Sequence, residues 1–347
     1  MEVGFDIELV VIDAKTKKLV LPYEEGGINL KKHTIPTIYG SGWIHTDGVM
    51  LEINPHPFAC RMESGWSIKE CLKGAEALIE KNYGRPVKLL ALPNTTLDKE
   101  IWKKAKLETL LLGCQPTYSA YEIGDTPCKV AVDSHYPYRG GAGHIHFSLN
   151  YARVPWTMFT LSHETAKILC KLLDRTLGII GVLLSPYPKL EALRRVTYGQ
   201  AGNYRLQPHG LEYRTLSNFY MIHPTITSLI HKIGRKVVND ALVNWPVRYD
   251  FLSLSNEYIQ KVINTNNVAA ARRIYQLPIF QDFLMRNEIG NLDILTYFTK
   301  NSLLKLFPHS GIVENWLYGT EAITQYGWED GVLPFWRRMR NGGGIDK

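Results

Sequence analysis

YGQAGNYRLQPHGLEYR, residues 198–214, is the stretch around which we expect the rest of the chain to fold. Two short runs, one around Tyr204 and one from Leu211 to Leu216, predict strands, and the Gln-Pro-His-Gly sequence between them predicts a turn. In the second run Glu212 and Arg214 are two residues apart, so their side chains leave the same face of the strand. A buried carboxylate and guanidinium need partners, which are either a structural ion pair or a metal ion and a phosphate.

The chain has the length and composition of one large folded domain. At 347 residues it exceeds an average domain, and with 45% hydrophobic and 11% aromatic residues it can form a full core, which excludes a disordered chain. We expect an α+β sheet domain over residues 1–224 and a helical extension over residues 225–347 that packs on it. The extension would support the sheet or form an oligomer surface, so a homo-oligomer is one expected state.

The formal net charge of +7 comes from lysines and arginines that are spread along the chain without a long run. This distribution argues against a dedicated nucleic-acid arm and suits an anionic ligand, although it does not exclude nucleic acid as a partner. The five cysteines form no CxxC pair, which favours a reduced, intracellular compartment. The N-terminus is acidic where a signal peptide would be basic, and the apolar run Leu177–Leu184 is too short to span a bilayer. We therefore expect a soluble, cytoplasmic protein without a membrane partner.

Two acidic strands precede the opening stretch. The first, Gly4 to Val11, alternates strictly and places Asp6 and Glu8 on one face, opposite an apolar face. Such a pair on an exposed edge could equally be a solvated face or a guard against aggregation. The second, Asp47 to Pro55, begins at an Asp-Gly turn and directs Glu52 and Asn54 to one face.

A third polar face follows a run of glycines in GGAGHIHFSLN, residues 140–150. Alternation places His144, His146 and Ser148 on one side of this predicted strand and apolar residues on the other. A single strand histidine is usually a hydrogen-bonded core residue, but two on one face behind a glycine-rich entry favour a ligand site. The chain has no HExxH motif and no cluster of zinc spacing, which argues against a closed structural zinc site.

Helices and loops complete the expected organisation. A capping box formed by Ser67 and Glu70 predicts a helix that ends at Gly84. Two further helices are predicted, over residues 155–184 and from Thr225 to Val243, while residues 93–140 have no clear assignment. Residues 22–46 predict a long loop, and this loop and residues 200–211 are candidate lids over a site.

If the polar faces of the four strands belong to one antiparallel sheet, they form a single wall of carboxylates and imidazoles. Clustered carboxylates repel unless divalent cations neutralise them, and oxygen ligands with an imidazole suit Mg²⁺ or Mn²⁺ better than zinc. Arg205 and Arg214, with Arg194 or Arg195, would supply forked donors to phosphate oxygens. No GxxxxGK[ST] motif is present. The combination predicts a nucleoside triphosphate site without a P-loop.

These motifs resemble those of glutamine synthetases and glutamate-cysteine ligases. The similar segments are GFDIE at 4–8, DGVMLEINP at 47–55, GAGHIHFSL at 141–149 and YR...GLEYR at 204–214, in the same order along the chain. The sequence YGQAGNYR...GLEYRTLSNF resembles most closely the bacteriophage type 2 branch of the carboxylate-amine ligases. The resemblance implies a glutamine-synthetase-like α+β catalytic fold, a curved, mostly antiparallel sheet with helices on its convex face. It also implies the host cytoplasm as the location, if the protein is phage-encoded.

The resemblance carries over to individual residues. It implies that Glu8, Glu52, His144 and Glu212 bind two or more Mg²⁺ ions around the ATP phosphates and that Asp6 is a further ligand. It also implies that His146 contacts the nucleotide or its phosphates and that Arg205 and Arg214 clamp the transferring phosphoryl group, with Glu52 beside them in the catalytic centre. Asp6 departs from the glutamate that is common in the larger synthetases, and the direction of Asp47, in a predicted turn, is left open.

The implied reaction is ATP-dependent amide formation. Phosphoryl transfer from ATP would convert a carboxylate into an acyl phosphate, which an amine attacks to give an amide, ADP and phosphate. The expected partners are small-molecule or peptide carboxylates and amines. Two alternatives stay open: a phosphotransferase acting on a guanidino or carboxyl group, and a phage binding protein that has kept the fold without turnover.

Overall fold

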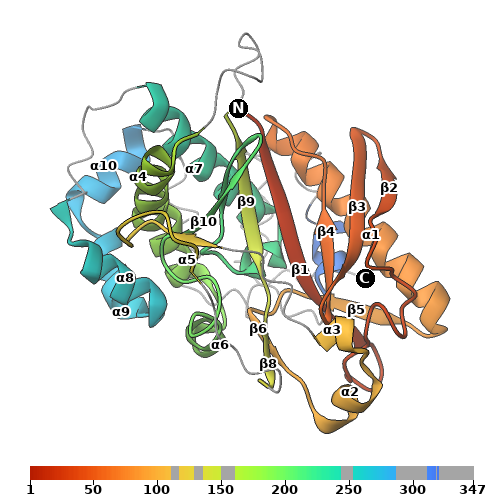
Figure 1. Cartoon of the computed structure of the whole chain (residues 1–347). Helices are drawn as coiled ribbons and strands as arrows, with labels where there is room; N and C mark the ends of the chain where they lie inside the picture. Colours follow the sequence, from red (N-terminus) through yellow and green to blue (C-terminus); the bar gives the residue numbers. More distant parts are fainter. Residues whose placement is uncertain are drawn as a thin grey trace, which may run out of the picture.

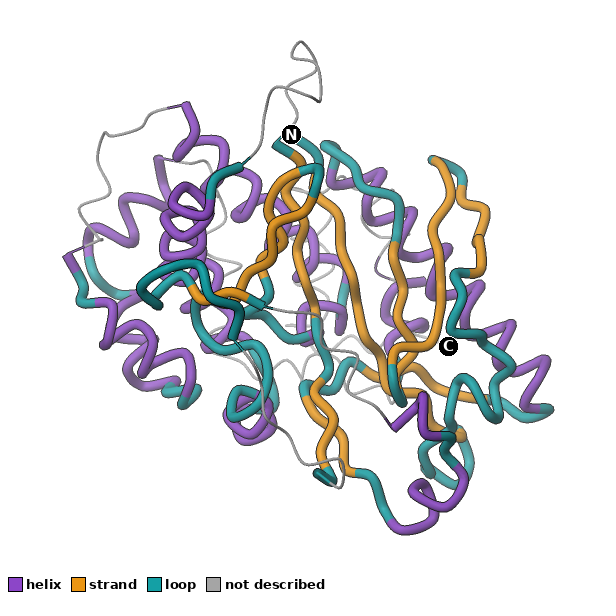
Figure 2. The backbone as a smooth tube through the Cα atoms, viewed as in Figure 1, coloured by secondary structure: helices purple, strands orange, loops and turns teal. Residues whose placement is uncertain are grey.

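The computed structural model describes residues 1–110, 117–128, 136–149, 161–243, 253–286, 311–317 and 319. Within these residues a nine-stranded sheet runs in the order β2-β3-β4-β1-β9-β11-β10-β7, with β5 paired to the far end of β1 (Figures 1 and 2). Every pairing in this sheet is antiparallel. Its strands are β1 (Val3–Asp13), β2 (His33–Thr37), β3 (Gly40–Asp47), β4 (Met50–Asn54), β5 (Val87–Leu90), β7 (Tyr118–Ser119), β9 (Gly143–Ser148), β10 (Asn203–Gln207) and β11 (Gly210–Tyr213). The expected α+β class with a large antiparallel sheet is confirmed.

The described residues also form helices and a small second sheet. The second sheet pairs β6 (Asn94–Thr96) with β8 (Tyr138–Gly140). The longer helices are α1 (Arg61–Tyr83), α4 (His163–Leu173) and α7 (Pro224–Val243), and α5 (Ile179–Leu184) continues α4 through the π-helical turn η2 (Asp174–Gly178). The shorter ones are α2 (Lys99–Lys104), α3 (Leu107–Leu110), α6 (Pro188–Arg194), the 3₁₀ helix η3 (Asn218–Ile222), α8 (Asn256–Asn264), α9 (Val268–Tyr275) and α10 (Pro278–Arg286).

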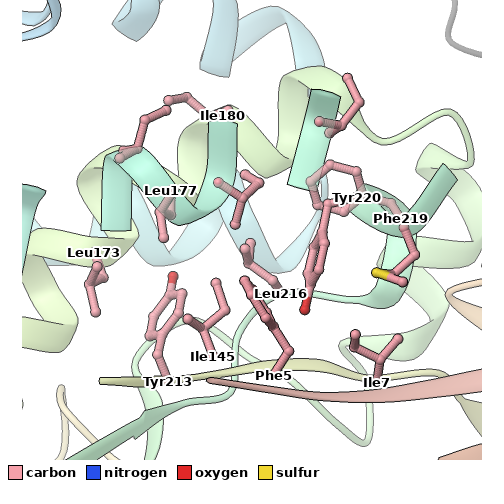
Figure 3. Close-up of a cluster of buried hydrophobic side chains, with 14 of the residues drawn as sticks. Phe5, Ile7, Ile145, Leu173, Leu177, Ile180, Tyr213, Leu216, Phe219 and Tyr220 are labelled. Carbon is pink, nitrogen blue, oxygen red and sulfur yellow. The ribbon is translucent and has the colours of Figure 1, made fainter. Parts of the chain in front are cut away.

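One face of the main sheet carries the hydrophobic core. The alternation of β1 sends Phe5, Ile7 and Leu9 to this face, where each is almost fully buried. Figure 3 shows Phe5 and Ile7 with Ile145 and Tyr213 of the neighbouring strands, beneath apolar side chains of the helices and of residues 216–220. The helices therefore cover one face of the sheet, and polar side chains at alternate positions belong to the other.

The expected loop over residues 22–46 is wrong in its second half, because β2 and most of β3 lie there. Pro36 and two glycines in residues 33–47 obscure the strand pattern, yet Ile44 is fully buried and pairs with His33. The glycine at position 42 has a packing reason, because a Cβ at this position would lie 2.2 Å from the Sγ atom of Cys71 on α1. Glycine therefore permits close packing of the hairpin on the helix rather than marking a loop.

Two helix starts also differ from the prediction. Helix α1 begins at Arg61, and Ser67 lies inside it, fully buried, with its Oγ accepting the backbone N–H of His56 at 3.2 Å. A capping-box pattern can occur inside a helix when its serine has a tertiary partner. The end at Gly84 is confirmed, with φ 76°. Helix α4 begins at His163 with Ser162 as its N-cap, and residues 155–160 of the predicted helix lie outside the described residues.

The helices after residue 224 share the core of the sheet. Helix α7 follows the prediction of Thr225–Val243 closely, and its Ile226, Ile233 and Val237 belong to the same hydrophobic cluster as Phe147 of β9. The division of the chain near residue 224 stays a prediction. No helix among the described residues is both long and apolar enough to cross a membrane.

Candidate active site

The polar faces of four neighbouring strands meet on the side of the sheet opposite the core. Directly opposed residues in an antiparallel pair share a face, so the register decides which polar groups are neighbours. Glu8 of β1 is opposite Glu52 of β4, and Asp6 is opposite His144 of β9. One strand further, His146 is opposite Glu212 of β11, which is opposite Arg205 of β10. The structure therefore gathers the polar groups of the four predicted strands into one wall.

The first grouping in this wall consists of three carboxylates, Glu8, Asp47 and Glu52. One oxygen from each lies within 4.8 Å of the others. Burial and the nearby charge of Asp47 raise the pKa of Glu8 to about 8. Burial and three neighbouring carboxylates, those of Asp6, Glu8 and Asp47, raise the pKa of Glu52 well above its usual range. The sheet thus holds carboxylates close together at a cost in electrostatic repulsion.

In this part of the wall, the sequence left the direction of Asp47 open and did not indicate His45 as a site residue. Asp47 lies at the end of β3 and faces the other two carboxylates, which settles the direction that the sequence left open. His45 places its Nε2 3.6 Å from Oε2 of Glu52. Both residues alternate with buried Ile44 and Thr46 along β3, so the period-two pattern could have identified them if residues 40–47 had been assigned to a strand.

The second grouping joins Asp6, His146 and Glu212, whose ligand atoms also lie within 4.8 Å of one another. His146 Nε2 lies 2.9 Å from Asp6 Oδ2. Asn54 connects this grouping to the first, because its side-chain amide donates to Asp6 Oδ1 and to Glu52 Oε1, each at 2.7 Å. The two groupings are therefore adjacent.

Two arginines pair with Glu212, which is completely buried. Arg205 Nη1 lies 3.2 Å from Oε2, and Arg214 Nη1 contacts Oε1. Gln207 donates from Nε2 to Oε2 at 2.6 Å. The ion pair considered from the sequence is therefore present, and Glu212 also belongs to the second carboxylate grouping. The Arg205 side chain is 18% exposed against 4% for Arg214, so Arg205 is the more accessible cation.

His144 and His146 have different surroundings. His144 is enclosed: its Nε2 lies 2.7 Å from the hydroxyl of Tyr198, and its Nδ1 lies 3.3 Å from Glu212 Oε1. Burial and the positive charges of Arg214 and Arg194 lower the pKa of His144 well below its usual range. Of the two histidines, only His146 belongs to a carboxylate grouping among the described residues. His146 is thus the histidine placed among residues that could hold a metal ion, whereas the resemblance implied His144 as a ligand.

Arg194 and Arg195 make contacts that hold the structure together. Arg194 is fully buried and donates to the carbonyl oxygens of Thr215 and Leu216 at 3.0 and 2.9 Å, which fixes the chain after β11. Arg195 donates to Asn266 Oδ1 at 2.7 Å and pairs with Glu191 at 3.2 Å. These contacts do not support Arg195 as a nucleotide ligand, because they account for its buried guanidinium with groups from outside both carboxylate groupings.

Comparison with known families bears on the same residues. Residues 132–249 match the family model of phage phiEco32-like COOH.NH2 ligase-type 2. The matched segment includes β9, β10 and β11, with His144, His146, Arg205, Glu212 and Arg214. The resemblance stated from the sequence is confirmed over this segment, which is similar to a family of carboxylate-amine ligases. The search of curated proteins finds no match.

The ligase family suggests ATP and a divalent metal ion, and the residues present fit such an ion. The first grouping offers three carboxylates whose pKa values are raised chiefly by burial, and hard divalent cations prefer oxygen ligands of this kind. The second offers two carboxylates and one imidazole, a set compatible with Mg²⁺ and favourable for transition-metal dications. Both positions lie on the face that carries Arg205 and Arg214, the groups suited to phosphate oxygens.

Proposed function

We propose that the protein is an ATP- and Mg²⁺-dependent carboxylate-amine ligase with a glutamine-synthetase-like fold. The observation that carries the proposal is the joining of the two groupings, Glu8/Asp47/Glu52 and Asp6/His146/Glu212, to the arginine pair on one face of an antiparallel sheet. A purely structural sheet would gain nothing from placing the carboxylate of Glu8 directly opposite that of Glu52. The match of residues 132–249 to the ligase family supports the same reaction class.

Each grouping would hold one divalent cation through its carboxylate oxygens, with His146 as the nitrogen ligand of the second. When bound, such cations neutralise the phosphate charge and the charge that develops in phosphoryl transfer. Arg205, the more exposed arginine, would bind phosphate oxygens. Arg214 would help to position it, because both arginines pair with Glu212. His144, enclosed by Tyr198 and Glu212, would keep this network in place.

The proposed reaction has two steps. A substrate carboxylate oxygen attacks the γ-phosphorus of ATP, the bond to the β–γ bridging oxygen breaks, and ADP leaves. The amine nitrogen then attacks the acyl carbon, phosphate leaves, and the nitrogen loses a proton to give the amide. An acyl phosphate reacts with water, so the site must close. The two candidate lids expected from the sequence contain β2, β3, β10 and the start of β11, which are strands of the sheet itself, so neither is proposed as a cover.

Calorimetry with Mg²⁺ and a non-hydrolysable ATP analogue tests the proposal directly. The wild type should bind the analogue only with Mg²⁺. Arg205→Gln should weaken binding about tenfold or more, because a charge-assisted contact to phosphate is lost. Arg273→Gln, a change at an exposed arginine on α9, is the matched control and should bind like the wild type.

Product analysis then separates the ligase from its alternatives. Mass spectrometry of reactions with ATP and paired acids and amines should detect an amide together with ADP and phosphate. A phosphorylated acid or guanidine without an amide would indicate the phosphotransferase instead. Absence of nucleotide binding by folded wild-type protein at millimolar concentration would overturn the ligase and favour a binding protein.

A further inference from the structure

His209 lies in the tight turn between β10 and β11 and contacts His146 without belonging to either carboxylate grouping. Its Nε2 is 3.3 Å from Nδ1 of His146, and the two rings are 5.4 Å apart. The opposite ring nitrogen of His146, Nε2, lies 2.9 Å from Asp6 Oδ2. His146 is therefore held between a carboxylate of the second grouping and the imidazole of His209.

The backbone fixes this contact. The carbonyl oxygen of His209 accepts the N–H of Leu149 at 2.9 Å, which ties the turn to the end of β9. Gly210, the next residue, has φ 145°, and a Cβ there would lie 2.3 Å from the carbonyl oxygen of Phe147. Only glycine permits this close crossing. The turn thus delivers His209 to the same strand that carries His146.

The tautomer of His146 determines which of its ring nitrogens can bind a metal ion. A neutral imidazole carries a hydrogen on one ring nitrogen and a lone pair on the other, and only the nitrogen with the lone pair binds a metal ion. For Nε2 of His146 to be the ligand, Nδ1 must carry the hydrogen and needs an acceptor. Metal-binding histidines generally have such an acceptor, usually a carboxylate, a carbonyl or a water molecule.

We propose that His209 is a positioning residue that accepts the Nδ1 hydrogen of His146 and so presents Nε2 of His146 to a metal ion held with Asp6 and Glu212. The inference rests on the proposed function for the existence of that ion. It adds a residue and a tautomer to the site. It also predicts selectivity, because a correctly presented imidazole strengthens binding of first-row transition dications more than of Mg²⁺.

Mn²⁺ is the probe, measured by electron paramagnetic resonance on the full chain without nucleotide, with Mg²⁺ as competitor. His209→Ala should weaken one bound Mn²⁺ about 10- to 100-fold, the usual effect of removing such a partner. It should also reduce the preference of that position for Mn²⁺ over Mg²⁺. His209→Gln should retain most of the affinity, since its side-chain carbonyl can accept the same hydrogen.

Two further variants make the result specific. His146→Ala removes the imidazole ligand and should lose the same Mn²⁺ as His209→Ala. His33→Ala, a change at a partly exposed histidine outside both groupings, should bind like the wild type. Circular dichroism on every variant identifies loss of fold, and the rescue by glutamine distinguishes positioning from general packing.

Unchanged Mn²⁺ affinity in folded His209→Ala would overturn the inference, and so would equal loss in the alanine and glutamine variants. Failure of the wild type to bind Mn²⁺ at all would overturn it too. If Mn²⁺ binds and depends on His209 but no ATP analogue binds, the inference stands and the ligase proposal fails. If the analogue binds with Mg²⁺ while His209→Ala leaves the Mn²⁺ affinity unchanged, the ligase proposal stands and the inference about His209 fails.

Discussion

At the scale of single residues, the Tyr198 hydroxyl connects the histidine and arginine networks. It lies 2.7 Å from Nε2 of His144 and accepts a hydrogen bond from Nη2 of Arg214 at 2.9 Å. The Tyr198 ring also lies beneath both Arg194 and Arg214, with centroid distances of 5.1 and 5.5 Å. Tyr198 thus fixes the direction of Arg214 through both its hydroxyl and its ring.

Tyr198→Phe should therefore reduce both turnover and stability. The ring contacts remain, but the lost hydroxyl releases His144 and one nitrogen of Arg214. We expect kcat to fall about 10- to 100-fold through misplacement of the arginine and the free energy of unfolding to fall by about 1–3 kcal/mol. Steady-state kinetics and urea unfolding measure the two effects. Tyr118→Phe, in a ring that meets His163 edge-to-face outside the groupings, is the control, and equal kcat in both variants would contradict the assignment.

The period of a strand tells which residues share a face but not how their side chains turn on that face. Alternation alone placed Asp6 with Glu8 and His144 with His146, and in the structure each pair lies on one face of its strand. It could not separate the two histidines, because the separation depends on Tyr198 and His209, which approach from other segments. Contacts between segments far apart in sequence leave no local pattern.

At the scale of elements, the π-helical turn η2 anchors the strand that carries Glu212. Asp174, the first residue of this turn, accepts from the hydroxyls of Tyr213 at 2.6 Å and Thr215 at 3.2 Å. These two residues alternate with Glu212 and Arg214 along the chain, and Figure 3 shows the Tyr213 ring pointing from the sheet into the core. The turn therefore holds β11 from the side opposite the candidate active site.

This anchor predicts a dependence of stability on pH. Burial raises the pKa of Asp174 from 3.8 to about 6, so the folded protein holds this proton more tightly than the unfolded chain. The stabilisation is complete below the unfolded pKa and is lost as the pH rises to the folded one. At 1.36 kcal/mol per pKa unit the loss is up to about 3 kcal/mol.

Asp174→Asn removes the titration while keeping an oxygen acceptor. Relative to the wild type, the variant should gain up to about 3 kcal/mol in the free energy of unfolding between about pH 4 and about pH 7. Urea unfolding at both pH values measures this difference, in which the other titrating groups cancel. A difference that does not change with pH would show that Asp174 is not protonated more readily in the folded state.

Elements with strong local signals could be predicted, and those that depend on packing could not. Strand β1 and helix α7 follow their apolar periods closely. The β2–β3 hairpin was missed because Gly42 and Pro36 are typical of loops, whereas here Gly42 lets the hairpin pack against Cys71 of α1. The omission mattered, since β3 carries His45 and Asp47 into the site.

At the scale of the whole molecule, the sheet separates its two functions by face. The apolar face binds the helices and stabilises the fold, whereas the polar face concentrates five carboxylates, those of Asp6, Glu8, Asp47, Glu52 and Glu212. Glu212 is paired with arginines, but Glu8, Asp47 and Glu52 repel one another. The stability of the entire chain should therefore report on what binds this face.

Mg²⁺ should raise the melting temperature of the wild type, and a chelator should reverse the effect. At a concentration 100 times its Kd the ion would add about 2.7 kcal/mol to the free energy of unfolding. Glu52→Gln should act oppositely in the two conditions. Without metal it should be more stable than the wild type by about 0.5–2 kcal/mol, because it relieves the repulsion at a strained functional site.

With Mg²⁺ the variant should gain much less than the wild type, because one ligand is lost. Glu100→Gln, at an exposed glutamate paired with Lys18, should behave like the wild type in both conditions. Thermal unfolding of the three proteins with Mg²⁺ and with chelator decides the matter. If Glu52→Gln were less stable than the wild type in both conditions, Glu52 would be a structural carboxylate and its grouping would not be a cation site. A Glu52→Gln variant that is more stable than the wild type without Mg²⁺, but less stabilised by Mg²⁺, would therefore show that the wild-type sheet loses stability in order to hold a metal ion.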